Sequence, residues 1–235
     1  MVSNMNFILI LAVGLFFSSV TFAHLIVMDG KVFYKNQQQE IFLFKDANYC
    51  FDPDAFSVEK LGRKKTDVLV VNFTEDCNPS GLYRIFEVTT QKSQEFYLSP
   101  LYDPEFKNDQ IIERFKDGAI SHKRIYALRS GKYSLQEQWK TLAPNIHLST
   151  RFSGASETYM LKDDSGIQIQ NLIITSPKAF LFDRYFIRKK AYLIQGDRVK
   201  INHIAKNKDN FYLSIDYIGK KNGVVKAYIM LSDVI

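Results

Sequence analysis

The chain is poor in the residues that most catalytic and metal sites use. Its 235 residues include two cysteines, four histidines and one tryptophan. Glycine and proline, at 11 and 6 residues, are too scarce for a collagen-like or linker-dominated architecture. The G-x-S-x-G, H-E-x-x-H, P-loop and dinucleotide-binding glycine patterns are missing. With 46% apolar and 24% charged residues the chain is expected to fold, and we predict a protein that is not an enzyme and uses no cofactor and no metal.

Two patterns keep other chemistry open. Acidic pairs occur at Asp52/Asp54, Asp103/Glu105 and Asp163/Asp164. A glycosidase needs two carboxylates across a cleft, but two of these pairs flank a proline, as ordinary turns do. If a signal peptide is removed after Ala23, His24 becomes the N-terminus, and its amine and imidazole could bind copper. The following Leu25–Met28 run is instead typical of a strand entering a core.

The first 23 residues contain no charged side chain. Phe7–Val20 is a mostly apolar run of 14 residues, followed by the small-residue site Thr21-Phe22-Ala23. This arrangement predicts a signal peptide at 1–23, cleaved after Ala23, and export to the periplasm. The alternative is an uncleaved anchor, although polar residues interrupt the roughly 20 apolar positions that a span needs.

Cys50 and Cys77 are the only cysteines. In an oxidising compartment an even pair predicts a disulfide, which would stabilise the fold by about 3.5 kcal/mol in the chain-entropy model. A cysteine nucleophile with a histidine partner would leave the second thiol unexplained. We expect Cys50–Cys77 to be bridged.

Short apolar runs separated by turn pairs predict a mainly β fold. In residues 111–142 successive runs meet at Asp117-Gly118 and at Ser130-Gly131, where glycine accepts the positive φ of a hairpin turn. We expect an antiparallel meander there. Further strands are expected at 31–34, 40–44, 67–73, 82–88 and 95–98. A loop at 161–166 is taken as the boundary between a strand-rich domain, 24–165, and a second domain, 166–235.

The run after Ser130-Gly131 alternates with period two. Tyr133, Leu135 and Trp139 are expected on one face of the strand, and polar residues such as Ser134 and Gln138 on the other. Glu137 interrupts the apolar face, so the strand is expected to end there or to reach the rim of the sheet.

The C-terminal 166–235 segment has five strand-like runs separated by tight turns, a pattern typical of a small barrel. Its Lys190-Ala-Tyr-Leu-x-x-Gly-Asp-x-Val199 stretch and its closing Ile229-x-x-Ser-Asp233 resemble the bacterial SH3-like domain of exported proteins. The Gly-Trp pair near the end of that family's domain is replaced by Ala227-Tyr228 in this chain. The resemblance implies an SH3-like β-barrel with Gly196-Asp197 as a turn. It also implies a role in cell-wall binding or as a scaffold.

The two halves differ in charge. Residues 166–235 hold 12 Lys and Arg against 5 Asp and Glu, a net charge of +7, whereas residues 1–165 hold 19 against 20, a net charge of −1. A basic module can attract an anionic polymer or an acidic protein, or can simply remain solvated. We predict no nucleic-acid partner, because recognition motifs are missing.

These features favour a non-enzymatic exported binding protein. Immunity proteins and hydrolase inhibitors are small, exported, disulfide-bonded and strand-rich, so a toxin or hydrolase of the envelope is the expected partner. The alternative is an accessory protein that binds peptidoglycan through the SH3-like domain. The oligomeric state is left open. The expected binding residues on the meander and the second domain are Arg124, Tyr126, Arg129, Tyr133, Lys189, Lys190, Lys220 and Lys221. We expect exposed aromatics of the meander to dominate.

Overall fold

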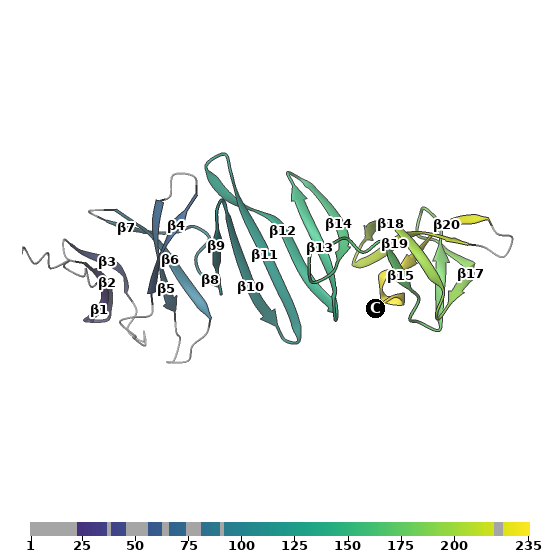
Figure 1. Ribbon diagram of the computed structural model, residues 1–235, viewed down its shortest axis with the longest axis horizontal. Coiled ribbons are helices and arrows are strands. Elements are labelled where there is room, and N and C mark those ends of the chain that lie inside the picture. The colour runs from purple at the N-terminus through teal and green to yellow at the C-terminus, as the bar shows by residue number, and fades with distance from the viewer. Residues whose placement is uncertain are drawn as a thin grey trace, which may run out of the picture.

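The computed structural model describes residues 23–36, 39–45, 56–62, 66–73, 81–89, 92–218 and 223–235. These residues form four antiparallel sheets and one short 3₁₀ turn, so the expected mainly β fold is confirmed. The sheets follow one another in chain order along an elongated molecule (Figure 1). Among the described residues, no helix is long and apolar enough to span a membrane.

The N-terminal half contains two small sheets. The first has the order β1 (His24–Met28), β2 (Lys31–Lys35), β3 (Glu40–Lys45). The second has the order β4 (Phe56–Leu61), β5 (Thr66–Phe73), β6 (Leu82–Val88), β7 (Ser93–Glu95), and β8 (Leu101–Tyr102) also pairs with β6. Four of the five expected strands lie in β2, β3, β5 and β6. The strand expected at 95–98 is wrong, because β7 ends at Glu95, Phe96 is buried and a turn follows.

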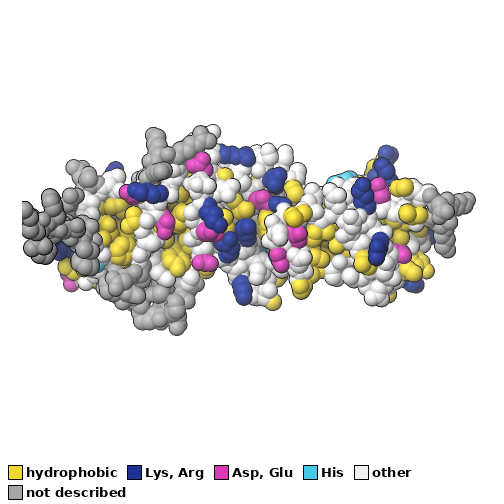
Figure 2. Space-filling view, viewed as in Figure 1, with side chains coloured by type: hydrophobic (Ala, Val, Ile, Leu, Met, Phe, Trp, Pro, Cys, Tyr) yellow, Lys and Arg dark blue, Asp and Glu magenta, His cyan; other side chains and the backbone are white. Residues whose placement is uncertain are grey.

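The expected meander is the middle of a six-stranded sheet. In chain order its strands are β9 (Glu105–Lys107), β10 (Gln110–Asp117), β11 (Ile120–Arg129), β12 (Lys132–Ala143), β13 (Ile146–Ser153) and β14 (Ser156–Lys162). Both predicted hairpin turns are confirmed, since Gly118 and Gly131 have φ of +58° and +81°. The sheet extends beyond the expected stretch by β9 before it and by β13 and β14 after it. Figure 2 shows basic side chains gathered over β10 and β11 on the face toward the viewer.

A bulge in β12 overturns the prediction that Tyr133, Leu135 and Trp139 share a face. Tyr126 of β11 lies opposite Leu135 of β12. The residue before it, Ile125, lies opposite Glu137 rather than opposite Gln136. Gln136 is therefore an extra residue without a partner on β11, and such an insertion reverses the face of every later side chain. Tyr133 and Leu135 pack into a core, whereas Glu137 and Trp139 lie on the other face. The strand does not end at Glu137 but continues to Ala143.

The C-terminal sheet has the order β15-β18-β19-β20-β16-β17. Its elements are β15 (Asn171–Ile173), β16 (Lys178–Phe182), β17 (Arg188–Ile194), β18 (Arg198–Asn207), β19 (Asn210–Ile218), β20 (Val224–Met230) and the 3₁₀ turn Leu231–Asp233. All six strands contribute to one hydrophobic cluster, so the sheet curls around its own core. Leu148 of β13 and Leu161 of β14 belong to the same cluster. The core thus crosses the boundary expected at 165/166.

Two further cores lie toward the N-terminus. One joins β4, β5 and β6 to the first strands of the meander through Ile85, Ile111, Tyr126 and Tyr133. The other packs the N-terminal sheet on β5 and β6, with Phe44 stacked on Phe86 at 5.6 Å between ring centroids. Each sheet is therefore fastened to its neighbour by apolar packing.

Candidate functional site: an apolar groove on the C-terminal sheet

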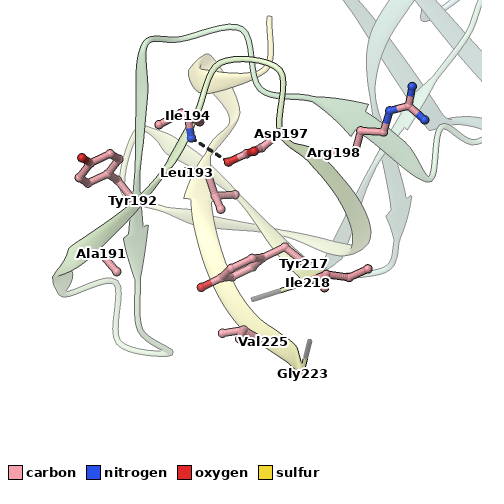
Figure 3. Close-up of a pocket in the computed structure, with 10 residues that line it drawn as sticks. All are labelled: Ala191, Tyr192, Leu193, Ile194, Asp197, Arg198, Tyr217, Ile218, Gly223 and Val225. Atoms are coloured by element: carbon pink, nitrogen blue, oxygen red, sulfur yellow. Dashed lines mark hydrogen bonds between the residues drawn. The ribbon is translucent and has the colours of Figure 1, made fainter. Parts of the chain in front are cut away.

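A groove of about 960 Å³ lies beside the edge strand β17. Its walls come from the end of β17, the following turn, the end of β19 and the start of β20 (Figure 3). In Figure 3 the ring of Tyr217 lies between Leu193 and Val225, in the middle of this group.

The β17 wall is apolar on both faces of the strand. Leu193 points into the core and is 6% exposed, so period-two alternation turns its neighbours outward. Tyr192 and Ile194 are accordingly 45% and 55% exposed. Strand β17 also ends the strand order of its sheet, so its outer edge has no described partner.

The opposite wall is a hairpin end with large exposed side chains. Ile218 lies opposite Val224, and Tyr217 lies opposite Val225. Ile218 is 77% exposed and Val224 is 67% exposed. On the far side of Tyr217, a second hollow of about 570 Å³ includes the exposed Ile173. Exposed apolar side chains grouped in this way commonly mark an interaction site.

The turn between β17 and β18 is held by hydrogen bonds. Gly196 has φ of +91°, a conformation that a side chain with a β-carbon rarely adopts, so the expected turn at Gly196-Asp197 is confirmed. The Ile194 backbone N–H donates to Asp197 Oδ2 at 2.9 Å, as the dashed line in Figure 3 shows. The Gly196 N–H donates to the Ile174 carbonyl at 2.9 Å. These bonds fix the wall that carries Ile194.

Few charges lie in the groove itself. Asp197 and Arg198 are the only ionisable acid and base among its described lining, and the guanidinium of Arg198 projects away from the other lining residues (Figure 3). The described lining is therefore mainly apolar, while the net charge of +7 belongs to the 166–235 segment as a whole. That combination suits a partner with an apolar contact surface and a negative net charge.

The structure places the expected meander residues differently. Tyr126 and Tyr133 are 8% and 6% exposed and belong to a core, so the expectation that they form an exposed aromatic surface is wrong. Burial raises the pKa of Tyr126 to about 12, and its hydroxyl donates to Glu113 Oε2 at 3.0 Å. Arg124 also contacts this carboxylate, at 3.4 Å. Glu113 thus anchors both side chains, although that of Arg124 is still 35% exposed.

The remaining predicted residues are scattered. Arg129 is exposed at the hairpin end of β11. Lys189 and Lys190 are exposed where the pairing of β16 with β17 becomes irregular, a place where lysines commonly protect a sheet edge from unwanted pairing. Lys220 and Lys221, the expected Cys50–Cys77 disulfide, and residues 1–22 of the predicted signal peptide lie outside the described residues.

No protein-family model matches the chain, and neither the curated proteins nor the solved structures give a significant match.

The groove residues were not predicted as a binding site, although the sequence contains a pattern that indicates them. Tyr192-Leu193-Ile194 is apolar at three successive positions, and a strand with one solvated face needs only every second position apolar. The run was explained by a barrel core, which accounts for Leu193 alone.

Proposed function

We propose that the protein is an exported, non-enzymatic binding protein that neutralises a toxin or hydrolase of the envelope by stoichiometric binding. The groove beside β17 is the binding surface. The observation that carries the proposal is the group of exposed apolar side chains around it, Tyr192, Ile194, Ile218, Val224 and Val225.

The energetic reason is that apolar contact dominates most protein interfaces. Each large side chain that the partner covers fully contributes about 1.5–3 kcal/mol, whereas an exposed charge pair contributes about 0–1 kcal/mol and weakens with salt. The walls are held by strand pairing and by the Asp197 hydrogen bond, so little ordering is needed on binding.

The partner is a protein with an apolar projection and an acidic surround. The net charge of +7 on residues 166–235 attracts such a surface and speeds its association. The exposed edge of β17 offers backbone groups with which an extended segment of the partner can pair.

The test uses the mature protein with Ile194→Asp and Ile218→Asp substituted together. The matched control is Val58→Asp on β4, which is 51% exposed and lies in a different sheet. Proteins retained from envelope extract are identified and purified, and their affinity is measured by calorimetry. We expect a stoichiometry of one, an affinity at least about 100-fold weaker for the double variant, and wild-type affinity for the control.

Sedimentation with purified sacculi is run in parallel. If the protein pellets with sacculi and no single partner is retained, the peptidoglycan alternative replaces the proposal. If a partner is found but the double variant, with an unchanged melting temperature, binds it normally, the groove is not the binding surface.

A further inference from the structure

The six-stranded sheet carries a second candidate site on the face opposite Tyr126. Arg114 of β10 lies directly opposite Lys123 of β11, and Lys123 lies directly opposite Trp139 of β12. Directly opposed residues of an antiparallel pair project to the same face, so these three form a row across the sheet.

The row forms the floor of a groove of about 550 Å³. Lys116, Thr141 and His147 extend the floor, while Asp103 and Asp164 come from the loops at its two sides. The floor is mainly basic because Arg114, Lys116 and Lys123 lie within it.

Three carboxylates near this groove have described partners, whereas Asp103, which also lines it, has no described ion pair. Glu105 accepts from Arg114 at 3.0 Å and also pairs with Lys107. Glu137 Oε1 accepts from the Trp139 indole at 2.7 Å, from Ser149 at 2.6 Å and from Lys162. Asp164 Oδ1 lies 2.7 Å from His147 Nε2. The described contacts of the Lys123 ammonium include the Trp139 ring, at 4.4 Å, but no carboxylate.

The charged form of Lys123 is destabilised in this position. Burial lowers its pKa, and the positive charges of Arg114 and Lys162 lower it further, against the opposing effect of Glu137 and Glu105. Like charges placed directly opposite each other destabilise a sheet. An anion seated between Arg114 and Lys123 would offset the repulsion between their positive charges.

The floor is also held in place before any ligand arrives. The Trp139 ring is fixed by the Glu137 hydrogen bond and packs closely on Gly166, where an added β-carbon would lie 3.2 Å from the ring. The His147 ring is held between Thr141 and Asp164, with Nδ1 3.0 Å from the Thr141 hydroxyl. Because these side chains are already ordered, binding requires little further loss of conformational entropy.

We propose that this face of the sheet binds an oxyanion, a carboxylate or phosphate group, with Lys123 as the central cation and Arg114 and Lys116 beside it. The site is separate from the groove at β17 and does not depend on the function proposed for that groove. The anion can belong to a free small molecule or to an acidic side chain of a bound polypeptide.

Trp139 is the only tryptophan of the chain, so fluorescence excited selectively at tryptophan reports on this site without a contribution from the 13 tyrosines. The mature protein is titrated with sodium phosphate at constant ionic strength, with sodium chloride as the reference salt. A hexaglutamate peptide forms a second arm, and tighter binding of the peptide than of phosphate identifies a polypeptide source. We expect a saturable change in emission with phosphate or peptide and none with chloride.

Lys123→Gln is expected to weaken that titration at least about tenfold, and Arg114→Gln serves as a second variant if the first does not fold. The matched control is Lys140→Gln, because Lys140 follows Trp139 on β12 and is exposed on the opposite face. The control is expected to titrate as wild type. A change that does not saturate, that chloride reproduces, or that Lys123→Gln and Arg114→Gln leave unaltered overturns the proposal.

Discussion

Glu137 shows how one residue can hold two strands and an aromatic ring together. Burial raises the pKa of its carboxyl, but hydrogen bonds from Lys162, Ser149 and Trp139 outweigh that effect, and the net pKa is below its ordinary value of 4.5. The stabilisation from this pKa difference is therefore fully present above about pH 4.5 and is lost as the pH falls through the lower, folded-state value.

Replacing Glu137 with Gln should lower the free energy of unfolding at pH 7 by about 3 kcal/mol, since Lys162, whose side chain is 10% exposed, loses its counter-charge. Stability of the variant should also vary less between pH 5 and 3. Urea unfolding followed by Trp139 fluorescence measures both. Glu40→Gln is the control, because its exposed pair with Lys35 at 4.0 Å is worth less than about 1 kcal/mol. Equal losses in the two variants would contradict this reading of Glu137.

At the scale of a strand, the bulge in β12 makes the two halves of one element serve different faces. Because Gln136 has no partner on β11, its deletion leaves Leu135 opposite Tyr126 and Glu137 opposite Ile125. Deleting Gln138 makes Glu137 and Trp139 adjacent in the strand. One of them must then move to the other face of the sheet.

We therefore expect the Gln136 deletion to fold with a loss below about 2 kcal/mol, and the Gln138 deletion to cost at least about 3 kcal/mol more, as a broken buried ion pair does. Both are one-residue deletions of a half-buried glutamine from one strand, so they control for each other in urea unfolding. A larger loss for Gln136 would show that the bulge itself is required.

What the sequence predicts well at this scale is local. The turns at Gly118 and Gly131 were predicted because a positive φ favours glycine, whereas the turn at Gly196 was expected from the family resemblance. The bulge at Gln136 has no residue signature, because glutamine also occurs in regular strands. A simple period-two pattern therefore assigns Trp139 to the wrong face. Strands β13 and β14 were missed because serine and threonine hide their alternation. The groove at β17 was missed because the apolar residues of that strand were assigned to a small barrel.

At the scale of the whole molecule, neighbouring sheets are joined by shared hydrophobic cores. Leu148 and Leu161 are 5% and 1% exposed and pack into the core of the C-terminal sheet. Covering each contributes about 1.5–3 kcal/mol. A loop near residue 165 marks a change of sheet, but the apolar packing continues across it, and composition alone does not reveal which residues lie under a neighbouring sheet.

This packing predicts a difference between two C-terminal fragments. Fragment 144–235, which includes β13 and β14, should melt more than about 10 °C above fragment 166–235, because two leucines together contribute at least about 3 kcal/mol and each kcal/mol shifts the melting temperature of a domain this small by about 4–8 °C. Circular dichroism melts of the two fragments measure the difference. Replacing Leu148 and Leu161 with alanine in the longer fragment should remove most of it, as the cavity cost of such substitutions is about 2–5 kcal/mol each. Equal melting temperatures for the two unsubstituted fragments would mean that residues 166–235 complete their core without the meander, as expected of an autonomous barrel.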